Sequence, residues 1–245
     1  MPEVTAEQFL DTFNKLEKHL NQLVGATEYY GFRRLVNQLS KRNGIVELHK
    51  QDLIEYSELR NAIVHKSTGE VIAEPHAETV THLQAIYDKL VDPPSVMSIA
   101  ATPVYTCDTK DMVDQLVRTM KQKFYAYVPV MHDGRFVGVF SENTLTKWLA
   151  DVTPGANLRL ADVTVGELQE YFDGPDDKAN AYTFVAQAAD VYHVQQQFLS
   201  FMSEKKRLGA IFITAHGRRE EPILGIVTAW DVSKIGTRAD ASLTT

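Results

Sequence analysis

The heptapeptide GIVTAWD at residues 225–231 has the form G-h-h-T-x-x-D, in which h is an apolar residue. An apolar run that ends in threonine, with an acid three residues later, indicates a strand that passes directly into a helix. Gly225 lets the strand pass close to its neighbours. Two interpretations fit the polar pair. Either Thr228 and Asp231 cap the helix, or Asp231 accepts hydrogen bonds from two ribose hydroxyls while Thr228 and the first helical amides meet phosphate oxygens.

A related heptapeptide, GVFSENT at residues 138–144, shows that this ending occurs twice. An offset of 82 residues aligns Asp108 with Asp190 and Met120 with Met202, and it grows to 87 at the glycines that open the two heptapeptides. Each copy has the pattern strand-helix-strand-strand-helix, and such an internal repeat is hard to obtain by chance. We therefore expect two half-sized units that pack against one another.

The predicted elements follow from apolar alternation and helical spacing. The first copy has predicted strands at 103–106, 125–130 and 136–140, and helices at 111–121 and from about 142. The second has predicted strands at 184–185, 210–214 and 223–227, and helices at 190–203 and from about 229. An Asp133-Gly134 pair between two apolar runs predicts a tight hairpin in the first copy.

The repeat, the segment YVPV at 127–130 followed by a hairpin and GVFS, and the segment GIVTAWDV at 225–232 resemble the CBS-domain family. The resemblance covers about residues 94–237. In that family two repeats form a tandem disc, called a Bateman module. Its clefts commonly bind adenosine-containing ligands such as AMP, ADP, ATP or S-adenosylmethionine.

The resemblance implies a role for each matching residue. Asp231 would hold the ribose, Thr228 would contact phosphate or ribose, and Ala210 and Ile211 would border the adenine. Arg207, with the two lysines before it, would meet phosphates, although a solvated basic helix end explains the same residues. The first copy has Thr144 where the acid is expected. This departure predicts one good ligand site rather than two.

Residues 5–92 have helical patterns throughout, with predicted helices at about 5–23, 28–42, 50–65 and 77–90. The Asp92-Pro93-Pro94 segment stops the pattern and predicts a domain boundary. The predicted fold class is therefore α+β. An all-α four-helix bundle at 1–93 precedes the first β-α-β-β-α repeat at 94–152, and the second repeat and a C-terminal tail follow at 153–245.

The segment ELRNAIVHK at residues 58–66 carries a conflict between pattern and residue type. On a helical wheel Arg60 falls within an apolar arc, while Asn61 and His65 are neighbours on its flank. The arc is formed by Leu53, Tyr56, Leu59, Ile63 and Val64. An arginine there must extend to solvent, face a partner or pair with an acid such as Glu55 or Glu58.

The same segment resembles the R-x4–6-H signature of the HEPN family, small four- to five-helix domains that pair as dimers. Arg60-Asn61-Ala-Ile-Val-His65 matches the common R-N-x-x-x-H form. Many members are metal-independent ribonucleases, and others are not catalytic. The resemblance implies that His65 acts as general acid or base and that Arg60 stabilises charge on phosphate, with Asn61 completing the catalytic set. If the domain is not catalytic, His65 is simply favoured near a helix C-terminus.

Composition limits the alternatives. The chain has 245 residues, a net charge of −7, 44% hydrophobic and 23% charged residues, as in ordinary soluble proteins. Residues 1–92 carry 10 Lys and Arg against 14 Asp and Glu, which disfavours broad nucleic-acid binding. One cysteine, Cys107, permits no internal disulfide. Without a signal-like start or a long apolar run, we expect a cytoplasmic protein that contacts no membrane.

Three functions remain. The first is an adenine-nucleotide sensor in which the CBS-like pair controls a dimeric helical domain. The second is a nucleotide-gated, HEPN-type endoribonuclease that acts on RNA. The third is a non-catalytic dimerisation scaffold. No histidine spacing indicates a metal site, and no P-loop or dinucleotide fingerprint is present, so we expect neither a metal nor a required cofactor.

Overall fold

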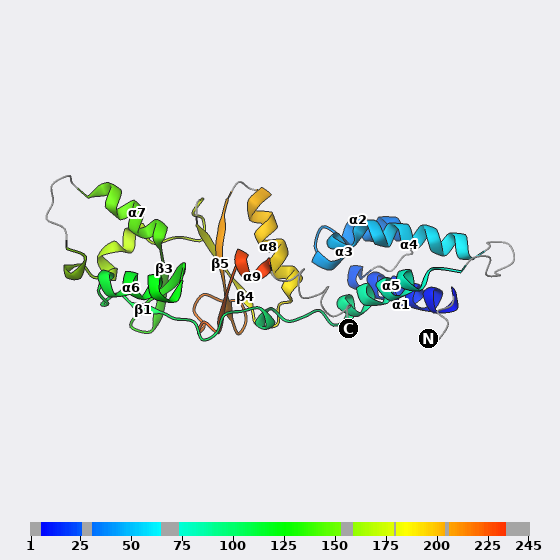
Figure 1. The fold of residues 1–245 in the computed structure, drawn as a ribbon, viewed down its shortest axis with the longest axis horizontal. Helices are drawn as coiled ribbons and strands as arrows, with labels where there is room; N and C mark the ends of the chain where they lie inside the picture. Colours follow the sequence, from blue (N-terminus) through cyan, green and yellow to red (C-terminus); the bar gives the residue numbers. More distant parts are fainter. Residues whose placement is uncertain are drawn as a thin grey trace. The chain divides into compact units, whose positions relative to one another are not determined.

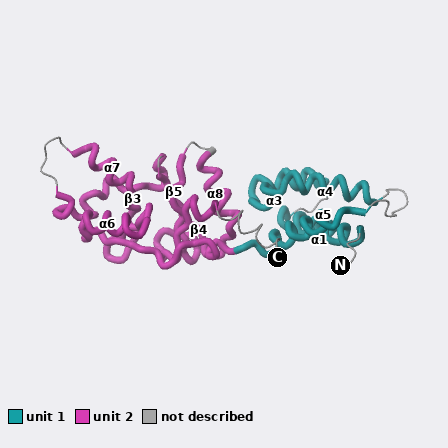
Figure 2. Tube along the Cα trace, viewed as in Figure 1, with its two compact units in different colours: residues 1–94 teal, residues 95–245 magenta. Residues whose placement is uncertain are grey.

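The computed structural model describes residues 6–25, 31–64, 74–152, 159–178, 180–203 and 206–233. The chain divides into two compact units, residues 1–94 and 95–245 (Figure 2). The division follows the Asp92-Pro93-Pro94 segment, where proline prevents the helix from continuing. Among the described residues, no helix has both the length and the apolar character that a membrane span requires.

The described part of the first unit is helical. Its elements are α1 (Ala6–Val24), α2 (Phe32–Leu39), α3 (Gly44–Leu48), α4 (Lys50–Ile63) and α5 (Ala77–Val91) (Figure 1). Helix α1 packs against α2, α4 and α5. The core is formed by apolar residues at helical spacing on these four helices: Phe9, Phe13, Leu16, Leu20, Leu35, Val36, Leu39, Leu53, Ile63, Leu83 and Ile86.

The region predicted as one helix over 28–42 is different in the structure. Helix α2 ends at Leu39, and Asn43 then caps a new short helix, α3. The Asn43 side chain accepts hydrogen bonds from the backbone N–H groups of Ile45 at 3.1 Å and Val46 at 3.0 Å. Asparagine therefore starts a helix here, as its N-cap preference allows. Helix order alone does not identify a HEPN domain, so that assignment stays a prediction.

The described residues of the second unit form two three-stranded sheets. The first has the order β1-β2-β3 and the second the order β4-β5-β6. In each sheet the first two strands are parallel and the last two are antiparallel. The first copy consists of β1 (Cys107–Asp108), α6 (Val113–Lys123), β2 (Tyr127–His132), β3 (Arg135–Ser141) and α7 (Glu142–Asp151). The second consists of β4 (Ala181–Ala186), α8 (Val191–Ser203), β5 (Leu208–Thr214), β6 (Gly225–Thr228) and α9 (Ala229–Val232).

The predicted hairpin in the first copy is present. Strands β2 and β3 are joined at Asp133 and Gly134, whose φ angles are +47° and +77°. Positive φ at both positions is what a type I′ turn requires, and Asp-Gly supplies it at low cost.

The two copies match as predicted, but the register of their first halves is shifted. In the first sheet Cys107 pairs with Val130, and in the second sheet Val185 pairs with Ile213. Cys107 therefore corresponds to Val185, which is an offset of 78 residues instead of the predicted 82. At this offset Met120 corresponds to buried Phe198, whereas Met202, its predicted counterpart, is 70% exposed. The error is four residues, about one helical turn, and a one-turn slip leaves the apolar face of a helix almost unchanged.

Short segments before each copy pack into the other copy. The 3₁₀ helix η1 (Val96–Ser98) contributes to the core of the second copy, while η2 (Leu160–Asp162) and η3 (Val165–Tyr171) contribute to the core of the first. Backbone bridges mark the crossings: Ala101 pairs with Ile226, and Asp173 pairs with Val139. The predicted boundary between residues 152 and 153 separates the repeats in sequence but does not separate their cores.

A third apolar cluster connects the two sheets. Val139 of the first copy packs with Tyr182, Ala210 and Phe212 of the second. The Phe136 ring also lies 5.4–5.9 Å from three rings of the second sheet, those of Tyr182, Phe184 and Phe212. Each half is too small for its own core, and this shared cluster supplies the missing burial.

Candidate functional site at the start of α9

One face of each sheet can be compared position by position between the two copies. Paired residues on neighbouring strands point to the same face, and so do residues two apart on one strand. In the second copy this face carries Ala101, Ile226, Thr228 and Ala210. In the first copy the equivalent positions carry Asp173, Val139, Ser141 and Tyr127. The second copy thus has two alanines where the first has a carboxylate and a tyrosine.

Thr228 and Asp231 form a capping box at the start of α9. The Asp231 carboxylate oxygen Oδ2 accepts from the Thr228 backbone N–H at 3.0 Å and from its hydroxyl at 2.8 Å. Both side chains are half-buried. The capping interpretation is therefore correct as geometry. It does not exclude a ribose contact, because a carboxylate can accept about four hydrogen bonds and the capping box uses two.

The other predicted contacts separate into two faces. Ala210 pairs with Thr228 and faces the cluster between the sheets. Ile211 belongs to the core beneath α8, so its side chain does not share a space with that of Ala210. Arg207 is exposed and directly precedes β5, which places it at the same end of the sheet as Thr228. The structure brings Thr228, Asp231, Ala210 and Arg207 to one end of this sheet, and it directs Ile211 elsewhere.

The first copy fills the equivalent region with a polar network around Asp173, which is 2% exposed. Its carboxylate accepts from the amides of Asn143 and Asn180, each at 3.3 Å. The Asn180 amide also donates to the Ser141 hydroxyl at 3.1 Å, and its oxygen accepts from the Tyr127 hydroxyl at 3.2 Å. These bonds join the strand end, the helix start and the segment before β4.

Lys147 closes this network from α7. Its ammonium group lies 2.5 Å from Asp177 and 3.5 Å from Asp173. Burial raises the pKa of Asp173, although hydrogen bonds from Ser141 and Asn143 act in the opposite direction. Burial lowers the pKa of Lys147, but its bond to Asp177 and the two nearby carboxylates outweigh that effect and raise the pKa. Lys147 therefore stays positively charged beside the buried carboxyl group of Asp173.

The capping pair of the second copy is more exposed to solvent than that of the first copy. Ser141 and Thr144, the capping pair of the first copy, are 1% and 0% exposed, whereas Thr228 and Asp231 are half-buried and Ala101 is exposed. Chain length explains part of this difference. Six positions separate Ala101 from Cys107, but twelve separate Asp173 from Val185. The longer connection carries Asp177 and Asn180, which cover the first half.

Residues of the first unit that were predicted to be catalytic are only partly described. Arg60 Nη1 donates to Asn61 Oδ1 at 3.3 Å, and His65 lies outside the described residues. The acids expected to pair with Arg60 have other partners: Glu58 binds Arg33 at 2.6 Å, and Glu55 accepts from Gln51 at 2.9 Å. Arg60 and Asn61 line a hollow of about 770 Å³ together with Phe13, Glu17, Gly31, Phe32, Arg33, Arg34, Asn37, Ser57 and Glu58.

Comparison with known proteins agrees with this topology. Residues 96–151 match the family model of the CBS domain. The second copy lies outside that match and has the same strand and helix order as the first. The comparison with curated proteins gave no match.

Several similar solved structures are named as CBS proteins. One is a conserved CBS domain protein of unknown function from Thermoplasma acidophilum, 21% identical over 60% of this chain and 72% of that chain, with a TM-score of 0.42. Another is the CBS domain of the bacterial CNNM/CorC family Mg²⁺ transporter in complex with ATP, with 16% identity, 62% and 92% coverage and a TM-score of 0.41. A third is CBSX2 in complex with AMP, with 15% identity, 60% and 98% coverage and a TM-score of 0.41.

Proposed function

We propose that the CBS pair binds one adenosyl ligand, such as AMP, ADP, ATP or another adenosyl compound, beside Thr228 and Asp231. Occupancy of this site then regulates the helical unit. The observation that carries the proposal is the asymmetry between the two halves. The half with the acid at the helix start has small neighbours, of which Ala101 is exposed and Ala210 buried, and its capping pair is partly accessible. In the half with Thr144 the capping pair is fully buried.

The chemistry of the accessible half suits a nucleotide. A carboxylate accepts strongly from the two hydroxyls of a ribose, and charge-assisted bonds of this kind are shorter and stronger than neutral ones. The first amides of α9 and the exposed guanidinium of Arg207 provide donors for phosphate oxygens. Ala101 and Ala210 leave more space than Asp173 and Tyr127 at the equivalent positions of the closed half. In this proposal Ile211 contributes through its backbone only, and the chain needs no further cofactor.

The test is isothermal titration of the full chain with AMP, ADP, ATP and S-adenosylmethionine, together with the variant Asp231→Ala. Two hydrogen bonds from ribose to a charged acceptor contribute about 1.5–3 kcal/mol each. Loss of even about 3 kcal/mol weakens binding roughly 100-fold. We therefore expect Asp231→Ala to weaken binding at least roughly 100-fold, which moves a micromolar dissociation constant to about 100 μM or above.

Asp231→Ala also removes a helix cap, so a matched control is needed. Glu167→Ala removes an equivalent capping-box acid, because Glu167 accepts from the Thr164 backbone at 2.7 Å and from its hydroxyl at 2.8 Å. Glu167 is exposed and belongs to η3, away from α9. Unchanged ligand affinity is expected for the control. If both variants lose binding equally, or if no adenosyl ligand binds at millimolar concentration, the proposal is wrong.

Regulation through a homodimer is the second part of the proposal. Large apolar side chains lie exposed on or beside helices of the CBS pair: Phe124 is 91% exposed, Trp230 73% and Met202 70%. We propose that these three side chains belong to the surface through which two chains associate, because exposed apolar side chains that form one patch mark such surfaces. We expect the chain to be a dimer by light scattering and Phe124→Ser/Met202→Ser to shift it toward monomer. A monomer at all concentrations, with and without nucleotide, contradicts this part.

An endoribonuclease gated by the nucleotide is a second candidate, favoured by the hollow beside Arg60. Arg33, Arg34 and Arg60 line it with Asn61, which provides donors for a phosphate backbone. We expect purified protein to cleave single-stranded RNA in EDTA, and Arg60→Ala or His65→Ala to reduce the rate by at least about 100-fold. Arg42→Ala is the control, because Arg42 is exposed and does not line the hollow. Equal cleavage by all four proteins assigns the activity to a contaminant, and no cleavage by any favours the dimerisation scaffold.

A further inference from the structure

We propose that His49, Asp52 and His82 bind a divalent transition-metal ion, with Zn²⁺ as the best fit. The three residues belong to the helical unit and are independent of the adenosyl site. The sequence predicted no metal, because His82 lies 30 residues beyond Asp52 and no common ligand spacing connects them. The fold brings the three side chains together.

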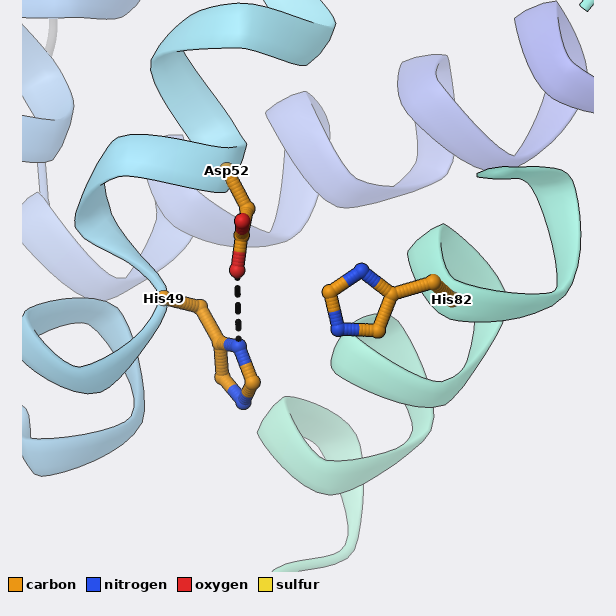
Figure 3. Close-up of side chains that lie close together, drawn as sticks. All are labelled: His49, Asp52 and His82. Atoms are coloured by element: carbon orange, nitrogen blue, oxygen red, sulfur yellow. Dashed lines mark hydrogen bonds and ion pairs between the residues drawn. The ribbon is translucent and has the colours of Figure 1, made fainter. Parts of the chain in front are cut away.

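Two helices supply the ligands. His49 directly precedes α4, Asp52 lies in the first turn of that helix, and His82 projects toward both from α5 (Figure 3). One potential ligand atom of each residue lies within 4.8 Å of the others. His49 Nδ1 is already 3.2 Å from Asp52 Oδ2. Two ligand atoms of a tetrahedral Zn²⁺ site lie roughly 3.3 Å apart, so small side-chain rotations close the remaining gap.

His49 has an unmet hydrogen-bonding requirement. Its side chain is 12% exposed, and its Nε2 atom is buried with no hydrogen-bond partner in the described part of the chain. The other ring nitrogen, Nδ1, is the one that faces Asp52 (Figure 3). A metal ion bound to Nδ1 would leave the ring proton on Nε2, so the direction of the Nδ1 lone pair, held by the burial of the ring, is what supports coordination by His49.

Tyr56 prepares His82 for the same role. The Tyr56 hydroxyl lies 2.6 Å from His82 Nδ1. A hydrogen bond on Nδ1 fixes the orientation of the ring and leaves Nε2 to coordinate the ion, as outer hydrogen bonds do in known histidine–metal sites. The ring of Tyr56 also packs on Phe9 of the core, which holds the hydroxyl in place.

The ligand set selects the class of ion. Two imidazoles and one carboxylate suit Zn²⁺ and its neighbours in the first transition row, whereas Mg²⁺ and Ca²⁺ prefer oxygen ligands alone. Three protein ligands leave a fourth position for water or a substrate group. Asp52 is 39% exposed, so that position is accessible from solvent. Asp52 also supplies the negative charge that offsets the cation.

The test is titration of the metal-free full chain with ZnCl₂ by calorimetry, and with CoCl₂ by visible absorption. We expect one strong equivalent of Zn²⁺ and a Co²⁺ spectrum with nitrogen and oxygen ligands. His49→Gln/His82→Gln should remove that equivalent, while Asp52→Asn and Tyr56→Phe should each weaken it about 10–100-fold. His76→Gln is the control, because His76 is an exposed histidine that directly precedes the same helix, α5.

Circular dichroism of each metal-free variant separates lost binding from lost folding, and Asp52→Asn provides a second test at a partly exposed position. Titration with AMP provides a separate readout, which the histidine variants should leave unchanged. Strong Zn²⁺ binding that survives in folded His49→Gln/His82→Gln overturns the proposal, because the ion then binds elsewhere. So does the absence of any Zn²⁺ binding tighter than that of free imidazole.

Discussion

Replacement of Lys147 by alanine tests whether an internal network holds the first half of the second unit closed. The Lys147 side chain is 35% exposed, and the side chains of its partners Asp173 and Asp177 are 1% and 17% exposed. Breaking a fully buried ion pair costs about 3–5 kcal/mol, and breaking an exposed one about 0–1 kcal/mol. A lysine that is one-third exposed falls between these limits. We therefore expect Lys147→Ala to destabilise the unit by roughly 1–3 kcal/mol at neutral pH.

The effect should depend on pH. Burial raises the pKa of the Asp173 carboxyl, and a carboxyl with a raised folded-state pKa contributes stability only below its unfolded pKa, losing it as pH rises through the folded value. Lys147 offsets that loss by favouring the ionised acid. Without it the ionised acid is more costly, so the deficit of Lys147→Ala is largest at neutral pH and shrinks as acid protonates Asp173.

Urea unfolding followed by circular dichroism at pH 7 and pH 4 measures both effects. Lys110→Ala is the matched control, because Lys110 forms a 3.0 Å ion pair with Asp133 in which the side chains are 74% and 69% exposed. The control should change stability by less than about 1 kcal/mol. The reasoning is refuted if the two variants lose equal stability, or if the deficit of Lys147→Ala is the same at both pH values.

Three further predictions concern single residues. Gly138→Ala should destabilise the chain by about 1–3 kcal/mol in urea unfolding, since an added Cβ would lie 2.8 Å from the Phe172 ring, whereas Gly174→Ala meets no atom within 4 Å and should be nearly neutral. Hydrogen bonds, chiefly from a backbone N–H of its loop, lower the pKa of Glu221 to about 2, so its carboxyl carbon should titrate by NMR near pH 2, and any stability it adds should be lost as pH falls from its usual pKa toward that value. A midpoint near 4.5 contradicts that contact. Burial raises the pKa of the Cys107 thiol to about 12, so iodoacetamide at pH 8 should modify the native chain far more slowly than the urea-unfolded chain, and equal rates would show that the thiol is accessible.

The repeat could be predicted from sequence because its signals are local. A glycine, an apolar run and a polar helix start recur at 138–144 and 225–231, and Asp133-Gly134 identifies the hairpin. The alignment of the first halves was wrong by four residues for a physical reason. Helical burial repeats about every turn, so Met120 matched the exposed Met202 nearly as well in pattern as it matches buried Phe198.

The closed half could not be predicted, because its cause is burial at long range. Asp173 lies in the segment Phe-Asp-Gly-Pro-Asp-Asp, which has the composition of a solvated turn. Only the fold shows that Asn180 and Lys147 surround it. The sequence carried a weak signal in the longer connection before β4. Thr144, which stands where an acid is expected, also distinguishes this copy, and the weaker ligand site inferred from it stays a prediction.

The cluster of His49, Asp52 and His82 could not be predicted either, because it also depends on contacts between residues far apart in the sequence. Helices α4 and α5 bring residues together that share no sequence motif, so the expectation of no metal rested on spacing alone. Arg60 shows the opposite case. Its conflict with the apolar arc was visible in sequence, and the structure resolves the conflict by placing it at the edge of a hollow rather than in the core.

Calorimetric titration of the full chain with adenine nucleotides measures the central claim most directly, because it counts sites. The predicted result is one equivalent per chain, which Asp231→Ala binds at least roughly 100-fold more weakly and Glu167→Ala binds with unchanged affinity. Two equivalents would mean that the half around Asp173 opens to ligand, and an equivalent that keeps its affinity without the Asp231 carboxylate would place the nucleotide elsewhere. Either outcome contradicts the assignment of a single accessible site to the start of α9.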